Sequence, residues 1–283
     1  MIKLCAFADE AATTLQGQID ALQRNGIRYL ELRNVNGKGV ASITLQEAEE
    51  YARILKENGI EVYSIGSPIG KVDISVDFDR YLEDITHIFR LARIFGTDKI
   101  RMFSFYNAFD KRELVISYLC RMVEKAKEYG VELYHENEKD IYGDTADRVL
   151  DVLQNVPGLK SVYDPANYLQ VGEKAEKTID LLYAKADYFH IKDVISATNE
   201  LVPAGYGDGK IDELIARIEG DIVLSVEPHL AVFDGYSQID STEMKHKFHF
   251  TSNQEAFDAA VAALKELLVR SGYKKNEWEY KKL

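Results

Sequence analysis

The 283-residue chain has few cysteines, no long apolar run and no linker rich in Pro, Gly and Ser. Its only cysteines, Cys5 and Cys120, both fall inside predicted regular elements, which excludes a disulfide framework and suits a reducing compartment. No stretch approaches the ~20 apolar residues needed to span a bilayer. The N-terminal segment is too short and turns acidic too soon for a signal peptide. We therefore expect a cytoplasmic protein that does not bind a membrane.

Positive charge is also scarce, because 35 Lys and Arg face 47 Asp and Glu and give a net charge of −12. An acidic protein repels nucleic acid and anionic membrane surfaces, so neither is an expected partner. A phosphorylated small molecule is not excluded, since a local basic pocket can exist on an acidic protein. With 46% apolar residues and no low-complexity run, the composition is that of an ordinary globular protein.

Short β-rich runs alternate eight times with longer amphipathic stretches along the chain. The predicted strands are Ile2–Phe7, Tyr29–Leu32, Glu61–Ile65, Lys99–Phe103, Glu132–His135, Leu159–Tyr163, Tyr188–Ile191 and Ile222–Val226. The predicted helices are Leu15–Asn25, Leu45–Asn58, Phe78–Phe95, Arg112–Tyr129, Thr145–Gln154, Lys174–Ala184, Ile211–Glu219 and Asn253–Ser271. A glycine precedes many of the strands, where a left-handed helix end is expected: Gly26, Gly59, Gly96, Gly130 and Gly220.

This alternation predicts a parallel sheet with right-handed crossovers. Eight units in 283 residues match a closed (β/α)8 TIM barrel, which typically takes about 250 residues. An open doubly wound sheet is the alternative, but a Gly-rich phosphate turn is missing after the first strand, where Phe7-Ala8-Asp9-Glu10 stands instead. We predict one barrel domain over residues 1–283, with a charged C-terminal extension from 271 to 283. We expect this tail to pack on the barrel exterior or on a neighbouring subunit.

Four potential metal ligands stand at or just past the ends of the fifth to eighth predicted strands: Glu136, Asp164, His190 and Glu227. The chemistry of such barrels gathers at the C-terminal ends of the strands. Three carboxylates that face one small space repel each other unless a cation lies between them. A donor set of three oxygens and one nitrogen suits Mn²⁺, Mg²⁺, Co²⁺ or Zn²⁺. The sequence therefore predicts one divalent metal site.

Four short motifs contain these ligands: His135-Glu136-Asn137, Asp164-Pro165-Ala166-Asn167, His190-Ile191-Lys192-Asp193 and Glu227-Pro228-His229. With them, the chain closely resembles the xylose-isomerase-like TIM barrels, the sugar phosphate isomerases and epimerases and their relatives. The resemblance implies that Glu136, Asp164, His190 and Glu227 bind the metal, with Mn²⁺ the expected ion. It also implies that Glu136 and Glu227 are the acid/base catalysts, as in the ketose 3-epimerases and hydroxypyruvate isomerases.

The expected function is therefore metal-dependent isomerisation or epimerisation of a small ketose, sugar acid or sugar derivative. A metal that binds the carbonyl and an adjacent hydroxyl oxygen lowers the pKa of the C–H between them. One carboxylate then removes the proton to give a metal-bound cis-enediolate. Return of a proton to the opposite face inverts the carbon, and return to the neighbouring carbon moves the carbonyl.

Other polar residues near the strand ends are candidates for substrate binding: Asn137, Asn167, Lys192, Asp193, His229 and Arg33. The two asparagines would bind sugar hydroxyls or cap the local backbone. Lys192 would meet a substrate oxygen or neutralise the acidic centre, and His229 would orient Glu227 or bind substrate. Arg101 lies within the fourth predicted strand and is a further candidate for the pocket.

Two departures from the ketose 3-epimerases leave the substrate open. Asn167 stands where those enzymes carry a histidine, and Ser196 stands where they carry an arginine. The additional ligands of two-metal xylose isomerases are missing, so proton transfer is favoured over a hydride shift. With six histidines and a negative net charge, the chain does not fit the three-zinc DNA-repair endonucleases of the superfamily.

Two alternative functions remain. One is a metal-dependent lyase or dehydratase, which would expel a β-substituent from an inosose or a 3-oxo-sugar derivative through the same enediolate. The other is a non-catalytic sugar-binding barrel, although the presence of both glutamates argues against it. Barrels of this family often associate, and we expect a homo-oligomer, either a dimer or a tetramer.

Overall fold

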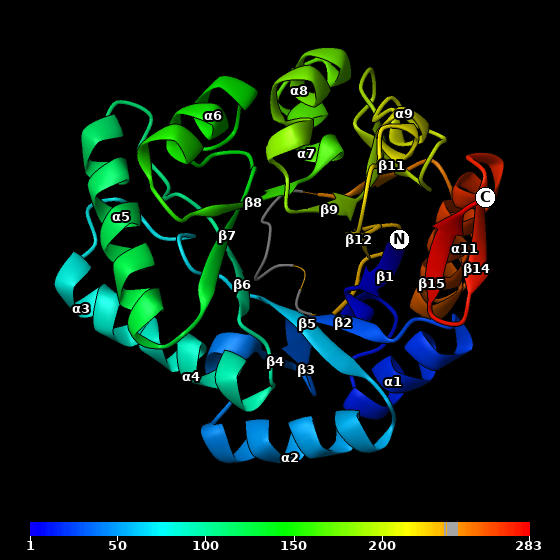
Figure 1. The fold of residues 1–283 in the computed structure, drawn as a ribbon, viewed down its shortest axis with the longest axis horizontal. Helices are drawn as coiled ribbons and strands as arrows, with labels where there is room; N and C mark the ends of the chain where they lie inside the picture. The colour runs from blue at the N-terminus through cyan, green and yellow to red at the C-terminus, as the bar shows by residue number, and fades with distance from the viewer. Residues whose placement is uncertain (235, 237–242) are drawn as a thin grey trace.

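Eight parallel strands close into a barrel in the computed structural model, which describes residues 1–234, 236 and 243–283 (Figure 1). In the order in which they pair, they are β1 (Ile2–Ala6), β2 (Tyr29–Leu32), β5 (Glu61–Gly66), β6 (Lys99–Met102), β7 (Glu132–Glu136), β8 (Lys160–Tyr163), β9 (Tyr188–Ile191) and β12 (Ile222–Val226). The last strand pairs back with the first, so that Ile2 lies opposite Ile222 and Ala6 opposite Val226. The predicted (β/α)8 barrel is confirmed, and an open sheet is excluded.

Helices surround the barrel and connect its strands (Figure 1). They are α1 (Leu15–Arg24), α2 (Leu45–Glu57), α3 (Phe78–Asp84), α4 (Thr86–Ile94), α5 (Arg112–Glu128), α6 (Ala146–Asn155), α7 (Pro165–Gln170), α8 (Ala175–Leu182), α9 (Ile211–Ala216) and α11 (Asn253–Arg270). Side-chain caps from Thr14, Thr44, Thr145 and Ser252 accept backbone N–H groups in the first turns and fix several helix starts. The five glycines expected at helix ends all have positive φ.

Several short elements that the sequence does not predict lie between the barrel strands and the next helices. A hairpin of β3 (Asn34–Val35) and β4 (Lys38–Gly39) follows β2. The strands β10 (Asp193–Ile195) and β11 (Glu200–Val202) follow β9, and β13 (Lys245–His246), which comes after β12, joins them in a small sheet. The 3-10 turns are η1 (Ala8–Glu10), η2 (Val40–Ser42) and η3 (Tyr183–Lys185). All but β13 and η3 come directly after strand ends of the barrel or their hairpins, at the side where catalytic residues gather in this fold.

The C-terminal tail forms a hairpin on the barrel of its own chain. Its strands are β14 (Tyr273–Asn276) and β15 (Glu279–Lys282), and they lie beside α11 in Figure 1. Strand β15 pairs antiparallel with the start of β1, where Ile2 lies opposite Tyr280. The partner of β1 on that side, β2, reaches only Cys5 and Ala6. The hairpin therefore covers the part of β1 that β2 leaves unpaired.

Aromatic side chains fill the lower interior of the barrel. Tyr63 on β5 and Tyr188 on β9 approach across it, with ring centroids 5.4 Å apart. Tyr134 on β7 lies 5.6 Å from Tyr188, and Cys5 is buried in the same cluster. This aromatic layer lies inside the barrel beneath the polar residues at the C-terminal ends of the strands. Within the described residues, no helix is both long enough and apolar enough to cross a membrane.

Candidate metal centre

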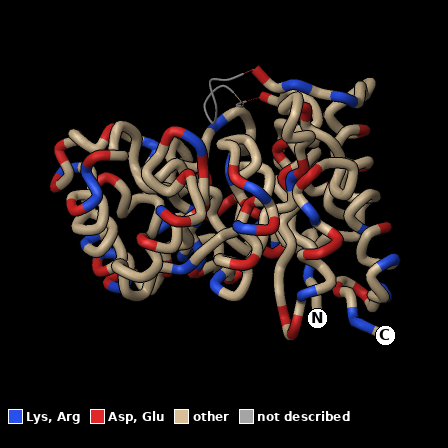
Figure 2. Tube along the Cα trace, turned by 90° about the horizontal axis from the view of Figure 1, so that it is seen from above, with Lys and Arg blue, Asp and Glu red and all other residues tan. Residues whose placement is uncertain are grey.

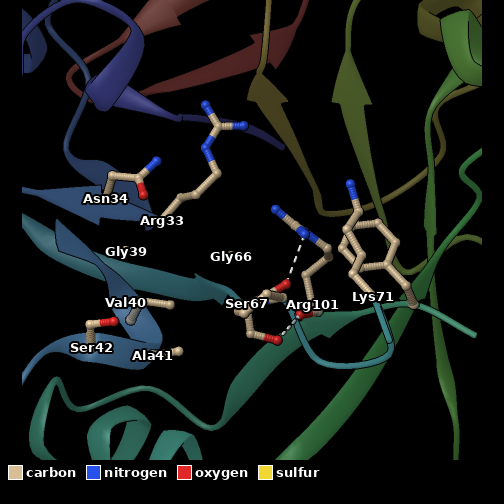
Figure 3. A pocket seen from close by; sticks show the side chains of 12 residues that line it. Arg33, Asn34, Gly39, Val40, Ala41, Ser42, Gly66, Ser67, Lys71 and Arg101 are labelled. Carbon is tan, nitrogen blue, oxygen red and sulfur yellow. Dashed lines mark hydrogen bonds between the residues drawn. The ribbon is translucent and has the colours of Figure 1, made fainter. Parts of the chain in front are cut away.

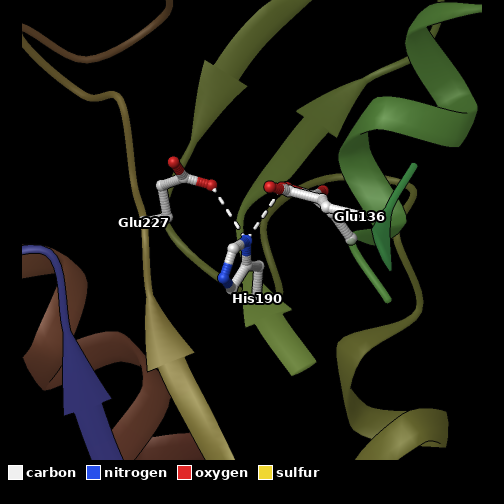
Figure 4. A group of neighbouring side chains, drawn as sticks. Glu136, His190 and Glu227 are labelled. Carbon is white, nitrogen blue, oxygen red and sulfur yellow. Dashed lines mark hydrogen bonds and ion pairs between the residues drawn. The ribbon is translucent and has the colours of Figure 1, made fainter. Parts of the chain in front are cut away.

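Glu136, Asp164, His190 and Glu227 converge at the C-terminal end of the barrel. Each offers one ligand atom, all four atoms lie within 4.8 Å of one another, and all four residues are buried. Nδ1 of His190 lies 2.8 Å from Oε1 of Glu136 and 3.3 Å from Oε2 of Glu227 (Figure 4). Three carboxylate oxygens and one imidazole nitrogen in so small a buried space fit a divalent cation. The structure thus brings together the four residues that the sequence singles out.

His190 is oriented by a carboxylate that the sequence does not single out, Glu31 on β2. Its Oε2 accepts from Nε2 of His190 at 3.1 Å and from the Ser225 hydroxyl at 2.8 Å, and its Oε1 accepts from the Tyr188 hydroxyl at 2.8 Å. Burial would raise the pKa of Glu31, but the charge and hydrogen bond of His190 hold it below its ordinary value. With Nε2–H directed at Glu31, Nδ1 is turned toward Glu136 and Glu227.

Two arginines hold the outer oxygens of the two glutamates. Nε of Arg101 lies 3.1 Å from Oε2 of Glu136, and Nη1 of Arg33 lies 2.7 Å from Oε1 of Glu227. Arg33 also binds Asp9 through two nitrogens, at 2.9 and 3.0 Å. Arg33 donates a hydrogen bond to Glu227, whereas Arg101 and Glu136 form an ion pair, and in each glutamate the other oxygen faces His190. Arg33, predicted at the rim as a substrate contact, is therefore buried in a carboxylate cluster.

Lys192 adds a positive charge to the centre. Its ammonium lies 3.0 Å from Oδ2 of Asp164 and 3.9 Å from Oε2 of Glu227. Burial would lower the pKa of Lys192, but the two carboxylates raise it well above its ordinary value, so the side chain stays charged. Lys192 and His190 in turn hold the pKa of Glu227 well below its usual range against the effect of burial. These contacts with Asp164 and Glu227 agree with the prediction that Lys192 neutralises part of the negative charge of the centre.

The two asparagines predicted to bind substrate make backbone contacts. The Asn137 side chain donates to the carbonyl of Asp164 and accepts from its N–H, both at 2.9 Å. Nδ2 of Asn167 donates to the carbonyl of Asn137 at 2.8 Å. These bonds join the segment after β7 to the segment after β8 and fix the position of Asp164. They support capping, the alternative that the sequence leaves open for both residues.

Asp193 is engaged in holding a loop. Its carboxylate accepts backbone N–H groups from Val194, Gly205, Gly207 and Gly209, at 2.9 to 3.0 Å. A Cβ on Gly207 would collide with Asp193 Oδ1, so glycine is required for this wrapping. The residue is fully buried, and these contacts give no support to the predicted substrate contact of Asp193.

His229 lies beside Glu227, as expected from its position two residues later. Its Nε2 is 3.7 Å from Oε1 of Glu227 and 3.4 Å from Oε1 of Glu10, and its backbone N–H donates to Oε2 of Glu10 at 2.8 Å. Together with Asn167 and Lys192, His229 lines a cavity on one flank of the metal centre. Arg33 and Arg101 line a second cavity on the other flank (Figure 3). Each cavity is lined by residues that contact the proposed ligands: Arg33 and Arg101 contact the two glutamates, and Lys192 contacts Asp164 and Glu227.

The chain belongs to the xylose isomerase-like TIM barrel family, whose sequence profile matches residues 19–232. No curated protein matches it. The structure resembles that of an L-ribulose 3-epimerase, with a TM-score of 0.72 and 17% identity over 96% of both chains. A probable 3-DHS dehydratase, AsbF, involved in petrobactin synthesis in Bacillus anthracis, gives a TM-score of 0.72 and 17% identity over 93% of this chain and 98% of that one. The structure of the IolI protein with a bound zinc atom gives a TM-score of 0.72 and 15% identity, over 95% of this chain and 99% of that one. At such identities the likeness concerns the fold alone.

Proposed function

We propose that the protein is a divalent-metal-dependent isomerase or epimerase of a small sugar or sugar derivative, in which Glu136 and Glu227 transfer protons. The observation that carries this proposal is the placement of the two glutamates on either side of His190 Nδ1, at 2.8 and 3.3 Å (Figure 4). Membership of the family and the epimerase fold among its structural neighbours agree with this function.

The four converging residues would hold the cation through Nδ1 of His190 and one oxygen each of Glu136, Asp164 and Glu227. When bound, such an ion supplies Lewis-acid polarisation of a carbonyl and acidifies the adjacent C–H. We propose Mn²⁺ as the first ion to test, with Mg²⁺, Co²⁺ and Zn²⁺ as alternatives, since this donor set accepts all four.

Proton transfer falls to the two glutamates because they approach the centre from different strands, β7 and β12. One carboxylate removes the proton from the substrate carbon to give an enediolate. The other, in its carboxylic acid form, delivers its proton to the opposite face or to the neighbouring carbon, so that one glutamate gains a proton and the other loses one. Arg101 and Arg33 keep both carboxylates oriented, and the Lys192 ammonium is placed to stabilise negative charge on a substrate oxygen. General acid–base catalysis of this kind contributes on the order of 10²–10⁴-fold.

The test is turnover in D₂O with Mn²⁺-loaded protein and a panel of ketoses, sugar acids, inososes and 3-oxo-glycosides, with products identified by mass spectrometry. Formation of an isomer that carries deuterium at the reacting carbon supports the proposal. Loss of water or of an aglycone would instead assign the protein to the lyases. Saturable sugar binding without turnover or deuterium exchange would assign it to the non-catalytic barrels.

A further inference from the structure

The guanidinium group of Arg33 fixes the outer oxygen of Glu227. Basic and acidic residues are interspersed over the molecule (Figure 2). Arg33 is only 4% exposed, however, and it lies among three buried carboxylates, those of Asp9, Glu10 and Glu227. Its Nη1 donates to Oε1 of Glu227 at 2.7 Å, while Nε and Nη2 donate to Asp9. The orientation of the guanidinium plane therefore decides where this oxygen of Glu227 is held.

Two aromatic rings face the same guanidinium group. Its central carbon lies 4.3 Å from the ring centroid of Phe7 and 4.9 Å from that of Phe233. Phe7 is fully buried directly after β1, and its N–H donates to the carbonyl of Val226 at 3.0 Å. Phe233 comes from the segment that follows β12. A cation over the face of a buried ring is attracted by the ring, so both rings favour one position of Arg33.

The segment after β12 is anchored on both sides of Phe233. Nδ2 of Asn253 donates to the carbonyl of Val232 at 3.0 Å, and the Thr13 hydroxyl donates to the carboxylate of Asp234. Val232 is 67% exposed, whereas Phe233 is only 4% exposed. The ring of Phe233 is therefore turned inward, onto Arg33.

The Phe233 ring also packs against a second neighbour of Glu227. The ring centroid of His229 lies 5.7 Å from that of Phe233. Nε2 of His229 is 3.7 Å from Oε1 of Glu227, the same oxygen that Arg33 binds. Phe233 thus packs against two side chains that approach the outer oxygen of Glu227, and a change at Phe233 reaches the glutamate through them.

We propose that Phe233 is a positioning residue for Glu227. The inference rests on the proposed function, in which Glu227 binds the cation and transfers a proton. With the ring in place, Arg33 is ordered before the ion arrives, so Glu227 keeps Oε1 on Arg33 and Oε2 toward the centre. Without the ring, Arg33 and Glu227 gain rotamers that binding of the ion must remove. Phe233 acts through Arg33 and is not itself a ligand.

Calorimetric titration with Mn²⁺ measures this effect. Phe233→Leu removes the ring but keeps an apolar side chain, and we expect it to weaken binding by about three- to tenfold, the cost of ordering a mobile side chain. Phe233→Tyr keeps the ring and should bind Mn²⁺ as the wild type does. Phe109→Leu is the matched control, because it removes a ring that lies 4.6 Å from the Arg148 guanidinium carbon and is 46% exposed at the surface.

The variant Arg33→Lys tests whether Phe233 acts through the guanidinium group. Lysine keeps the charge but has no planar group to lie on a ring. In this background, Phe233→Leu should change the Mn²⁺ affinity by less than about twofold, because coupled residues are not additive. The proposal is overturned by wild-type affinity in Phe233→Leu, or by the same loss in both backgrounds.

A second measurement needs neither metal nor substrate. Nε–H of Arg33 donates to Asp9 at 2.9 Å, and NMR follows its hydrogen exchange in the metal-free protein. Exchange should be at least about threefold faster in Phe233→Leu and unchanged in Phe109→Leu. An unchanged rate in Phe233→Leu also overturns the proposal. If Mn²⁺ does not bind even to the wild type, the proposed function fails, and the exchange rate alone decides whether Phe233 positions Arg33.

Discussion

At the scale of single residues, the two ring nitrogens of His190 have different surroundings. Nε2 faces Glu31, which also accepts from Tyr188 and Ser225, whereas Nδ1 faces the two glutamates. A carboxylate behind a metal-binding imidazole fixes its tautomer and its orientation and raises its basicity. Glu31 therefore acts on the proposed ion through His190, without being one of its ligands.

Replacing Glu31 with Gln should weaken metal binding by about 10–100-fold, because the amide no longer fixes the proton on Nε2. Calorimetric titration with Mn²⁺ and with Zn²⁺ measures the effect. Glu61→Gln, at the exposed start of β5, is the control and should bind both ions as the wild type does. An unchanged affinity in Glu31→Gln would show that His190 needs no such partner.

Glu136→Gln and Glu227→Gln should each lower turnover by about 10²–10⁴-fold, since an amide keeps the shape of the side chain but does not accept the proton. Turnover and deuterium exchange are measured side by side with the substrate found in the panel. A variant that exchanges deuterium without forming product has kept the base and lost the proton donor. Glu132→Gln, at the other end of β7, serves as the control. Wild-type turnover in either active-site variant would remove that glutamate from the mechanism.

The four ligand candidates could be found from the sequence because each follows from its own strand end and from the resemblance to the family. Glu31 could not, because its role depends on β2 carrying it inward to face a histidine on β9. Asp193 shows the opposite failure. An aspartate just after a strand is predicted to be a site residue, but the carboxylate of Asp193 accepts hydrogen bonds from backbone N–H groups of a glycine-rich loop.

At the scale of elements, the predicted strands and helices agree with the structure to within a few residues, because hydrophobic period and glycine C-caps mark them independently. The predicted helix Phe78–Phe95 is divided at Ile85 into α3 and α4, although its apolar period continues across the division. The two- and three-residue strands of β3, β4, β10 and β11 carry no readable period. They arise from contacts between loops, which sequence patterns do not contain.

The capping box at the start of α2 predicts a pH-dependent stability. The bond from Lys38, with those from Thr44, lowers the pKa of Glu47 from 4.5 to about 2. Because the folded state favours the ionised form, its stabilisation is complete above pH 4.5 and is lost as the pH falls toward 2. The difference in urea midpoint between the wild type and Glu47→Gln should therefore be present at neutral pH and shrink over that window. Glu50→Gln, exposed on the same helix, should show no such trend.

At the scale of the whole molecule, the first and last strands close the barrel, and the C-terminal hairpin covers the start of the first strand. Removing residues 272–283 would unpair the start of β1 and uncover the surface packed against Tyr273 and Tyr280. We expect a loss on the order of 2–4 kcal/mol in the free energy of unfolding. Metal affinity should be preserved, since the hairpin lies at the end of the barrel opposite the ligands.

Urea unfolding and metal titration of the truncated protein measure both quantities, and removal of Leu283 alone is the control because its side chain is 91% exposed. A truncated protein as stable as the wild type would show that the hairpin contributes nothing to the free energy of unfolding. The expected dimer or tetramer stays a prediction, for which light scattering is the measurement.

Closure by β1 and β12 also sets the order of events during synthesis. Ile2 pairs with Ile222, which is synthesised about 220 residues later. Synthesis of that length of chain takes roughly 10–45 s at cellular translation rates. During that interval the first strand has an unpaired edge, which is a site for aggregation or for a chaperone. Glu227 follows directly after β12, so the last ligand arrives with the strand that closes the barrel. Nascent fragments that stop before this strand should not capture the ion as the complete barrel does, so metal loading should be among the last steps in making this protein.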